Sequence, residues 1–220
     1  MKHPQTQLEG HHNLDIQGRM RDIIAKEAAA VAAIHINGEF EKAVNILLNC
    51  QGKVVTTGMG KAGYIAHKFA ATMASTGTPA FFIHPAEAGH GDLGMLSKGD
   101  CIVAFSTSGK SIEVIEMLQI ASNLGAETVI GVTSHVDSTL REYADVILDM
   151  GPDIEEPCPL KLAPSATIAV MLAISDALAL TLMELKNFTA ADYHARHHRG
   201  YLGSRSRQPR LYDSDPNANH

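Results

Sequence analysis

Two short stretches of the chain combine small residues with groups that bind anions. The first, residues 58–63 (GMGKAG), follows an apolar run and starts a helical pattern at Lys61. Backbone amides at the start of a helix attract negative charge, and a lysine there adds a full positive charge. The second, residues 106–111 (STSGKS), carries four hydroxyls where one is enough to cap the following helix. Together they predict a phosphate site; the alternatives are tight packing of the first turn and capping of the following helix by the second.

The glycine spacing of residues 58–63 formally matches a dinucleotide-binding turn. An acidic residue that holds the ribose should follow about 20 residues later, but Phe81, Phe82, Ile83 and His84 occupy that region. A P-loop is excluded because its four-residue spacer and its Lys-Ser/Thr pair are missing. We therefore expect no nucleotide or redox cofactor.

The elements that must position these stretches follow from an alternation of apolar runs and helical periods. Strands are predicted to start near Val54 and to cover residues 80–83, 100–105, 128–132 and 144–148. Helices are predicted from Lys61 onward and over residues 112–124, 138–143 and 166–186. Short, continuously apolar strands separated by helices predict an α/β fold, a doubly wound parallel sheet of about five strands.

A helical pair, over residues 14–36 and 40–48, is predicted before the first strand. The first of these helices is amphipathic, which suits packing on its own sheet and packing across a subunit boundary equally well. We expect one domain over residues 14–203, with flexible tails at 1–13 and 204–220.

Composition restricts the function classes. A net charge of −6 argues against a nucleic-acid partner. The apolar stretch at 168–185 contains two acidic residues and predicts a buried helix rather than a membrane span. The N-terminus lacks an apolar signal core, and the three cysteines form no CxxC pair. These features predict a cytoplasmic protein without disulfides.

Six motifs carry a close resemblance to a known family: GMGKAG, ASTGTP, HPAEAGHGDLGM, STSGKSIE, EEPCPLKLAP and SDALA. They resemble the sugar isomerase (SIS) family, and within it the arabinose 5-phosphate isomerases, over residues 15–203. The resemblance implies a flavodoxin-like five-stranded sheet and a homotetramer. It also implies an enzyme that interconverts D-ribulose 5-phosphate and D-arabinose 5-phosphate, which supplies 3-deoxy-D-manno-octulosonate (Kdo) for lipopolysaccharide or capsule.

The resemblance further implies four catalytic residues, Lys61, Glu113, Glu156 and His197. Aldose–ketose isomerisation needs a base beside the carbonyl and a charge that stabilises the enediolate. We expect Glu156 to be the base, with a pKa raised by burial, and Glu113 to orient hydroxyls. Lys61 would stabilise the oxyanion or the phosphate, and His197 would move protons or open a cyclic sugar.

Further substrate and phosphate contacts are expected at Gly60, Ser75, Thr76, His90, Ser106, Thr107, Ser108, Gly109, Ser111 and Thr167. No metal is expected to be required, because His84 and His90 lack the i, i+4 spacing of a zinc pair. Inhibitory zinc or copper binding at His90 is a separate expectation. Lys61, Glu113 and Glu156 also have structural alternatives, as helix-start or solvated loop residues.

Several positions depart from the family pattern. Lys110 replaces a glutamate, which should favour anion binding, and Ala166 replaces a hydroxyl-bearing residue. His198 and Arg199 replace a proline and a glycine beside His197. CBS domains often follow in the family; we expect none here, so that feedback would act at the SIS domain itself. Whether His197 serves a neighbouring subunit's site stays open.

Two other functions compete with this one. One is a different SIS isomerase that acts on a hexulose or heptulose phosphate, and the other is a non-catalytic phosphosugar sensor. The EEPCPLKLAP and HPAEAGHGDLGM motifs favour the pentose isomerase over the first alternative. The presence of all four catalytic residue types argues against the second.

Overall fold

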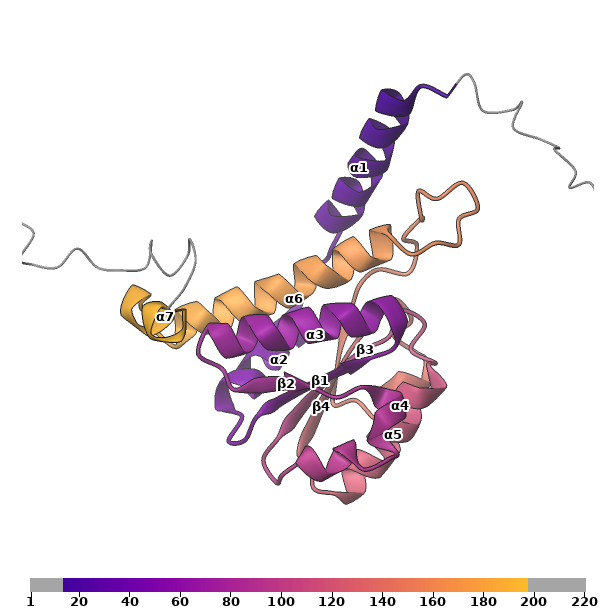
Figure 1. Ribbon diagram of the computed structural model, residues 1–220. Helices are drawn as coiled ribbons and strands as arrows, with labels where there is room; N and C mark the ends of the chain where they lie inside the picture. The colour runs from indigo at the N-terminus through magenta and orange to yellow at the C-terminus, as the bar shows by residue number, and fades with distance from the viewer. Residues whose placement is uncertain (1–13, 198–220) are drawn as a thin grey trace, which may run out of the picture.

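The computed structural model describes residues 14–197 of the chain, so the expected tails at 1–13 and 204–220 lie outside the described residues. Its centre is one sheet of five parallel strands in the order β2-β1-β3-β4-β5 (Figure 1). The strands are β1 (Val54–Gly58), β2 (Ala80–Phe82), β3 (Cys101–Phe105), β4 (Thr128–Thr133) and β5 (Val146–Asp149). The expected α/β class and five-stranded parallel sheet are therefore confirmed.

The neighbouring strands β1 and β3 are buried along their whole length, which explains their continuous apolar runs. They pair in register from Val54 opposite Cys101 to Gly58 opposite Phe105. The third strand starts one residue later than expected. The buried carboxylate of Asp100 instead accepts hydrogen bonds from the amides of Lys53 and Ser97, at 2.7 and 2.8 Å, and closes the loop before it.

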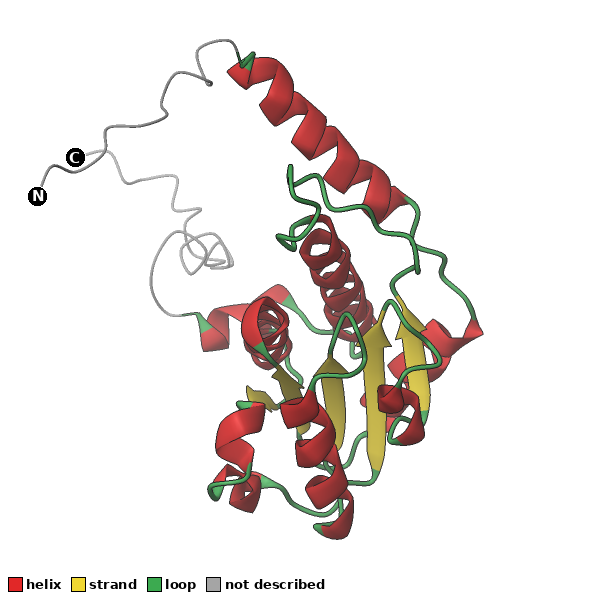
Figure 2. Cartoon of the chain, turned by 90° about the vertical axis from the view of Figure 1, so that its right-hand side faces the viewer, coloured by secondary structure: helices red, strands yellow, loops and turns green. Residues whose placement is uncertain are grey.

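Helices cover both faces of the sheet (Figures 1 and 2). Three long helices pack on one face: α2 (Gly38–Asn49), α3 (Gly60–Ser75) and α6 (Ala166–Leu185). The opposite face is covered by α4 (Pro85–Ala88) and α5 (Ile112–Asn123). Each layer has its own apolar core, so the sheet is sandwiched as in other doubly wound folds.

Three short elements complete the described chain. The 3₁₀ helix η1 (Asp92–Met95) follows α4, so the segment between β2 and β3 contains two short helical turns. The helix expected at 138–143 is a single 3₁₀ turn, η2 (Thr139–Glu142). After α6 the chain turns into α7 (Ala190–Arg196), which starts with a capping box formed by Thr189 and Asp192.

The GMGKAG turn has a packing role. Gly60 has a φ of 59°, a left-handed conformation that favours glycine. A Cβ at Gly63 would lie 2.5 Å from the carbonyl oxygen of Gly58, so only glycine lets α3 approach β1 this closely. The tight packing expected as one alternative for this turn is therefore present, and it brings the start of α3 to the edge of the sheet. Phosphate binding at the turn stays a prediction.

The leading helix α1 (Ile16–Ala32) extends away from the sheet and has no buried residue (Figure 1). Its main contact is with α6, and Arg19 also donates to the carbonyl of Pro157. Ile16, Met20 and Ile24 are each more than half exposed. Within one chain, α1 therefore does not pack on the sheet as one of the two expectations had it.

The length and apolar composition of α6, with a mean hydropathy of 2.0, would also suit a membrane span. Half of its most apolar window is buried inside the molecule, where Val170, Ile174 and Leu178 pack into the core. A buried core helix satisfies the same criteria of length and composition, and α6 has the contacts of one.

Candidate functional site

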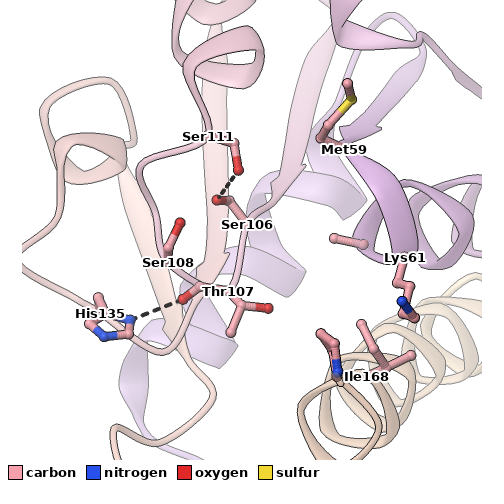
Figure 3. Close-up of a pocket in the computed structure, with 10 residues that line it drawn as sticks. Met59, Lys61, Ser106, Thr107, Ser108, Ser111, His135 and Ile168 are labelled. Atoms are coloured by element: carbon pink, nitrogen blue, oxygen red, sulfur yellow. Dashed lines mark hydrogen bonds between the residues drawn. The ribbon is translucent and has the colours of Figure 1, made fainter. Parts of the chain in front are cut away.

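A cavity of about 340 Å³ opens at the carboxyl edge of the sheet, beside the ends of β1 and β3 (Figure 3). The strand order reverses between these two strands, which is where open α/β sheets bind ligands. The starts of α3, α5 and α6 and the loop after β4 surround it. The lining residues are Met59, Lys61, Ala62, Ser106, Thr107, Ser108, Ser111, His135, Pro164 and Ile168.

The loop of residues 106–111 forms one wall of the cavity. The hydroxyls of Ser106 and Ser111 lie 3.0 Å apart, and Ser108 Oγ accepts from the amide of Lys110 at 3.2 Å. Ser111 starts α5 without a side-chain bond to the helix amides. The hydroxyls are thus not used to cap the helix, which leaves the N-terminal amides of α5 available to an anion.

Lys61 lies on the other side of the cavity, in the first turn of α3 (Figure 3). The residue that precedes the helix, Met59, provides no side-chain cap, and the first turn contains no acidic residue. The positive end of the α3 dipole and the ammonium group therefore act in the same direction. Two uncapped helix starts and one lysine make this cavity favourable for a phosphate or another oxyanion.

Glu156 is held at the start of α6. Its carboxylate accepts from the amides of Ser165 and Ala166 at 2.7 and 2.8 Å, and from the amide and hydroxyl of Thr167 at 3.2 and 2.5 Å. Burial opposes ionisation, but the hydrogen bonds from Thr167, Ser165 and Ala166 prevail and lower the pKa of Glu156 below its ordinary value. The expectation that burial raises this pKa is wrong, because the carboxylate caps a helix.

Two other residues expected in the site, Thr167 and Glu113, differ in whether their side chains already form hydrogen bonds. The hydroxyl of Thr167 is committed to Glu156 and is buried. Glu113 is the second residue of α5 and partly buried, and within residues 14–197 its carboxylate has no hydrogen-bond partner. Glu113 lies next to the hydroxyl loop but is not among the cavity-lining residues.

Two glycines and one histidine that were expected to contact the substrate differ in how close they lie to the cavity. Gly60 adjoins the cavity through its neighbours Met59 and Lys61. Gly109, with a φ of 61°, lies inside the hydroxyl loop, where a Cβ would collide with Ser138. His90 follows α4 on the surface and is exposed, and it does not line this cavity.

Three expected residues lie at the opposite end of the molecule. Ser75 and Thr76 end α3, about 24 Å along a 16-residue helix, and both hydroxyls donate to the carbonyl of Thr72. His197 follows α7, beyond the 20 residues and about 30 Å of α6. Its ring stacks on Tyr193, with centroids 3.9 Å apart. Within one chain, the structure does not bring these three residues to Lys61.

The contacts around α7 fix this arrangement. Lys186 Nζ, at the end of α6, donates to Thr78 Oγ1 at 2.7 Å, and the Phe188 ring packs against Gly77. The ends of α3 and α6 are therefore side by side, away from the cavity that lies at their starts. The neighbours His198 and Arg199, at which the sequence departs from the family, lie outside the described residues.

Sequence reasoning missed five lining residues, of which His135 is the one with chemical potential. Its Nδ1 lies 3.1 Å from the carbonyl oxygen of Thr107 (Figure 3). It follows β4 by two residues, next to the strand that carries the hydroxyl loop. Because neighbouring parallel strands end at the same edge, its position after a predicted strand was the signal that could have identified it.

A metal site of three or more histidine, cysteine or acidic residues does not occur within residues 14–197. The expectations that no metal is required and that metals inhibit at His90 therefore remain predictions.

Comparison with known proteins identifies the family to which the sequence is similar. The SIS domain model matches residues 47–181. The chain is 44% identical over 195 residues to the arabinose 5-phosphate isomerase KdsD of Pseudomonas aeruginosa, covering 88% of this chain and 59% of the relative. It is 38% identical to the arabinose 5-phosphate isomerase KpsF of Escherichia coli, covering 84% and 57%. The chain thus spans less than two thirds of the length of these relatives.

A solved structure matches more of its own length. The Escherichia coli CFT073 protein in complex with arabinose 5-phosphate is 40% identical, with a TM-score of 0.80. The match covers 84% of this chain and 98% of that one. The match to the SIS domain model extends over all five strands of the sheet and over both Lys61 and the hydroxyl loop.

Proposed function

This chain belongs to the SIS domain family, and we propose that it interconverts D-ribulose 5-phosphate and D-arabinose 5-phosphate. The observation that carries the proposal is the cavity between Lys61 and the hydroxyl loop at 106–111, where two helix starts without side-chain caps face one space. A phosphate monoester carries close to two negative charges and has three acceptor oxygens that suit such a site. The similarity to arabinose 5-phosphate isomerases supports a pentose phosphate as the substrate.

The reaction moves a carbonyl between C1 and C2. A base removes the proton beside the carbonyl, an enediolate forms, and the proton returns to the neighbouring carbon. We assign the stabilisation of the enediolate oxygen to Lys61, whose charge lies at the positive end of α3. No redox cofactor is needed, because the aldose and the ketose are isomers: one carbon is oxidised as its neighbour in the same molecule is reduced.

The arrangement of the two glutamates changes their proposed order. Glu156 was expected to be the base, but a carboxylate with four donors and a lowered pKa is a weak one. Glu113 is free of such bonds within the described residues, and we propose it as the base. Glu156 then holds the start of α6, with Pro164 and Ile168, against the cavity.

We further propose that the enzyme acts as a homotetramer in the cytoplasm, in which a neighbouring copy brings His197 to the cavity. The support is the separation of His197 from Lys61 by the length of α6 and the exposed apolar stripe of α1. Its product would supply Kdo synthesis for lipopolysaccharide or capsule. No nucleic-acid or membrane partner is part of the proposal.

The two other candidate functions use the same cavity. A hexulose or heptulose phosphate isomerase would differ in the length of sugar that it accepts. A phosphosugar sensor would bind without turnover and would not need Glu113. These alternatives are separated by one experiment.

Purified protein is incubated with a chelator and, in separate reactions, with ribulose 5-phosphate, arabinose 5-phosphate or a control phosphate of ribose, xylulose or a hexulose, and the products are resolved. We expect arabinose 5-phosphate alone, at the same equilibrium ratio from either direction. Conversion of a hexulose phosphate instead would replace the pentose assignment. Binding of ribulose 5-phosphate without any product would support the sensor and remove the isomerase. Loss of turnover with the chelator would contradict the expectation that no metal is required.

A further inference from the structure

His135 is held in one orientation against the hydroxyl loop. Its Nδ1 lies 3.1 Å from the carbonyl oxygen of Thr107, and its amide donates to Thr133 Oγ1 at 3.1 Å. A carbonyl oxygen can only accept, so Nδ1 carries the proton. Within the described residues Nε2 has no hydrogen-bond partner, and the ring lines the cavity.

The loop that carries His135 is locked to the hydroxyl loop by several bonds. The amide of Ser134 and the hydroxyl of Thr133 donate to the same Thr107 carbonyl, at 3.0 and 3.1 Å. The amide of Leu140 donates to the carbonyl of Gly109 at 2.9 Å. An exposed histidine usually samples several rotamers, but here three donors converge on one carbonyl and fix the two loops relative to each other.

We propose that His135 is a specificity-determining residue that recognises the phosphate group of the substrate through Nε2, an inference that rests on the proposed function. Figure 3 places His135 beside Thr107 and Ser108, with Lys61 across the cavity. A phosphate held by the hydroxyl loop would thus have His135 on its outer side and the reacting end of the sugar toward Lys61. Because Nδ1 is bound to the Thr107 carbonyl, Nε2 is the ring nitrogen left for the ligand, and one hydrogen bond joins it to a phosphate oxygen.

The first test is independent of turnover. Long-range ¹H–¹⁵N NMR spectra of the ¹⁵N-labelled full chain are recorded while inorganic phosphate is added. The Nε2 resonance of His135 is expected to shift with saturation, while Nδ1, bonded to Thr107, keeps the shift of a protonated nitrogen. The resonance is assigned by its loss in His135→Phe. An Nε2 that does not respond to phosphate would overturn the inference.

The second test separates binding from chemistry. His135→Phe keeps the ring and removes both nitrogens, and should raise KM for arabinose 5-phosphate about tenfold with little change in kcat, the effect of losing one hydrogen bond to a charged group. His135→Gln, which offers an amide donor, should recover part of this loss. His35→Phe, at an exposed position before α2, is the matched control. Cooperative thermal unfolding of each variant establishes that it is folded.

The outcomes of the two tests distinguish the inference from the proposed function. Active enzyme with an unchanged KM in His135→Phe would overturn the role of His135 and leave the isomerase standing. A wild-type protein without isomerase activity whose Nε2 responds to phosphate would overturn the isomerase and keep the anion site. A fall in kcat alone would assign His135 to the chemical step and contradict phosphate recognition.

Discussion

At the scale of single residues, Lys61 is proposed to have two roles in one cavity: it stabilises the enediolate and it attracts the phosphate. It is the only lysine or arginine among the described residues that line the cavity, and it faces the hydroxyl loop from the first turn of α3. A fixed positive charge at a site where an oxyanion develops stabilises the transition state more than the ground state. The same charge would attract the phosphate, so its two effects must be separated by kinetics.

We expect Lys61→Met to lower kcat by about a hundredfold or more, as removal of one oxyanion-stabilising donor does in other enzymes. Lys110→Met is the control, because Lys110 belongs to the hydroxyl loop but is exposed and does not line the cavity. The measurement is steady-state turnover of arabinose 5-phosphate at saturating substrate. A Lys61→Met enzyme with a raised KM and full kcat would assign Lys61 to phosphate binding alone.

Some residues of the site could be predicted from local sequence features, and others could not. Lys61 and the hydroxyls at 106–111 were identified from type and position, because glycine turns and helix starts are local features of the sequence. The state of Glu156 could not be identified in this way. Its partners Ser165, Ala166 and Thr167 are about ten residues away, and the loop between them has no regular geometry that sequence encodes.

At the scale of elements, the important feature is that three helices start at one cavity and only one of them is capped by a carboxylate. Glu156 satisfies the first amides of α6, while α3 and α5 start without side-chain caps. The cap neutralises the positive end of α6 and directs an incoming anion to the other two helices. Glu156 thereby positions α6 even without taking part in proton transfer.

Replacement of Glu156 by Gln should destabilise the fold at pH 7 by about 1 kcal/mol, the usual range for a helix cap that is partly exposed to solvent. Because the pKa of Glu156 is lowered in the folded state, its stabilisation is present above the unfolded value of 4.5 and is lost as pH falls through the folded pKa. The difference between wild type and Glu156→Gln should therefore disappear at low pH. Urea unfolding at several pH values measures it.

The neighbouring residue supplies a control for this prediction. Glu155 is exposed and pairs only with Lys161, at 2.9 Å, within the described part of the chain, so Glu155→Gln should change the stability far less. An equal effect of both replacements would contradict the cap. If Glu156→Gln kept its stability and lost only turnover, the carboxylate would belong to the reaction, and Glu113 would not be the base.

The positions and types of the long elements followed from sequence, since buried parallel strands and amphipathic helices each have a clear period. The short ones did not. The turns α4 and η1 lie in a segment rich in proline and glycine, and η2 is a single 3₁₀ turn. Such turns are decided by tertiary contacts, for example those of Ala88, Leu93 and Leu140 in the core beneath α5.

At the scale of the whole molecule, the described chain presents features that a second copy would explain. His197, Ser75 and Thr76 lie at the ends of α6 and α3, whereas the cavity lies at their starts. The helix α1 has no buried residue and exposes Ile16, Met20 and Ile24. The motifs assign a role to these residues but do not show which subunit's site they serve, because residues of one site can come from different copies.

This separation permits a test by mixing inactive variants. Lys61→Met and His197→Ala are each expected to be inactive as pure proteins. If each site takes Lys61 from one copy and His197 from another, a mixed pair contains one site with both residues intact and one with neither. Denaturing the two variants together and refolding them at equal amounts should then restore about one quarter of wild-type activity, since half of random pairs are mixed and each has one of two sites intact.

The amount of activity that returns identifies the origin of His197. If Lys61 and His197 of the same copy act together, every site in every mixture lacks one of them, and no activity returns. Each variant refolded alone controls for recovery by residual wild type. A mixture of Lys61→Met with wild type controls for refolding yield, because half of its sites keep Lys61 whichever copies pair. Activity in the first mixture requires that at least two copies build one site, which the exposed stripe of α1 would then hold together.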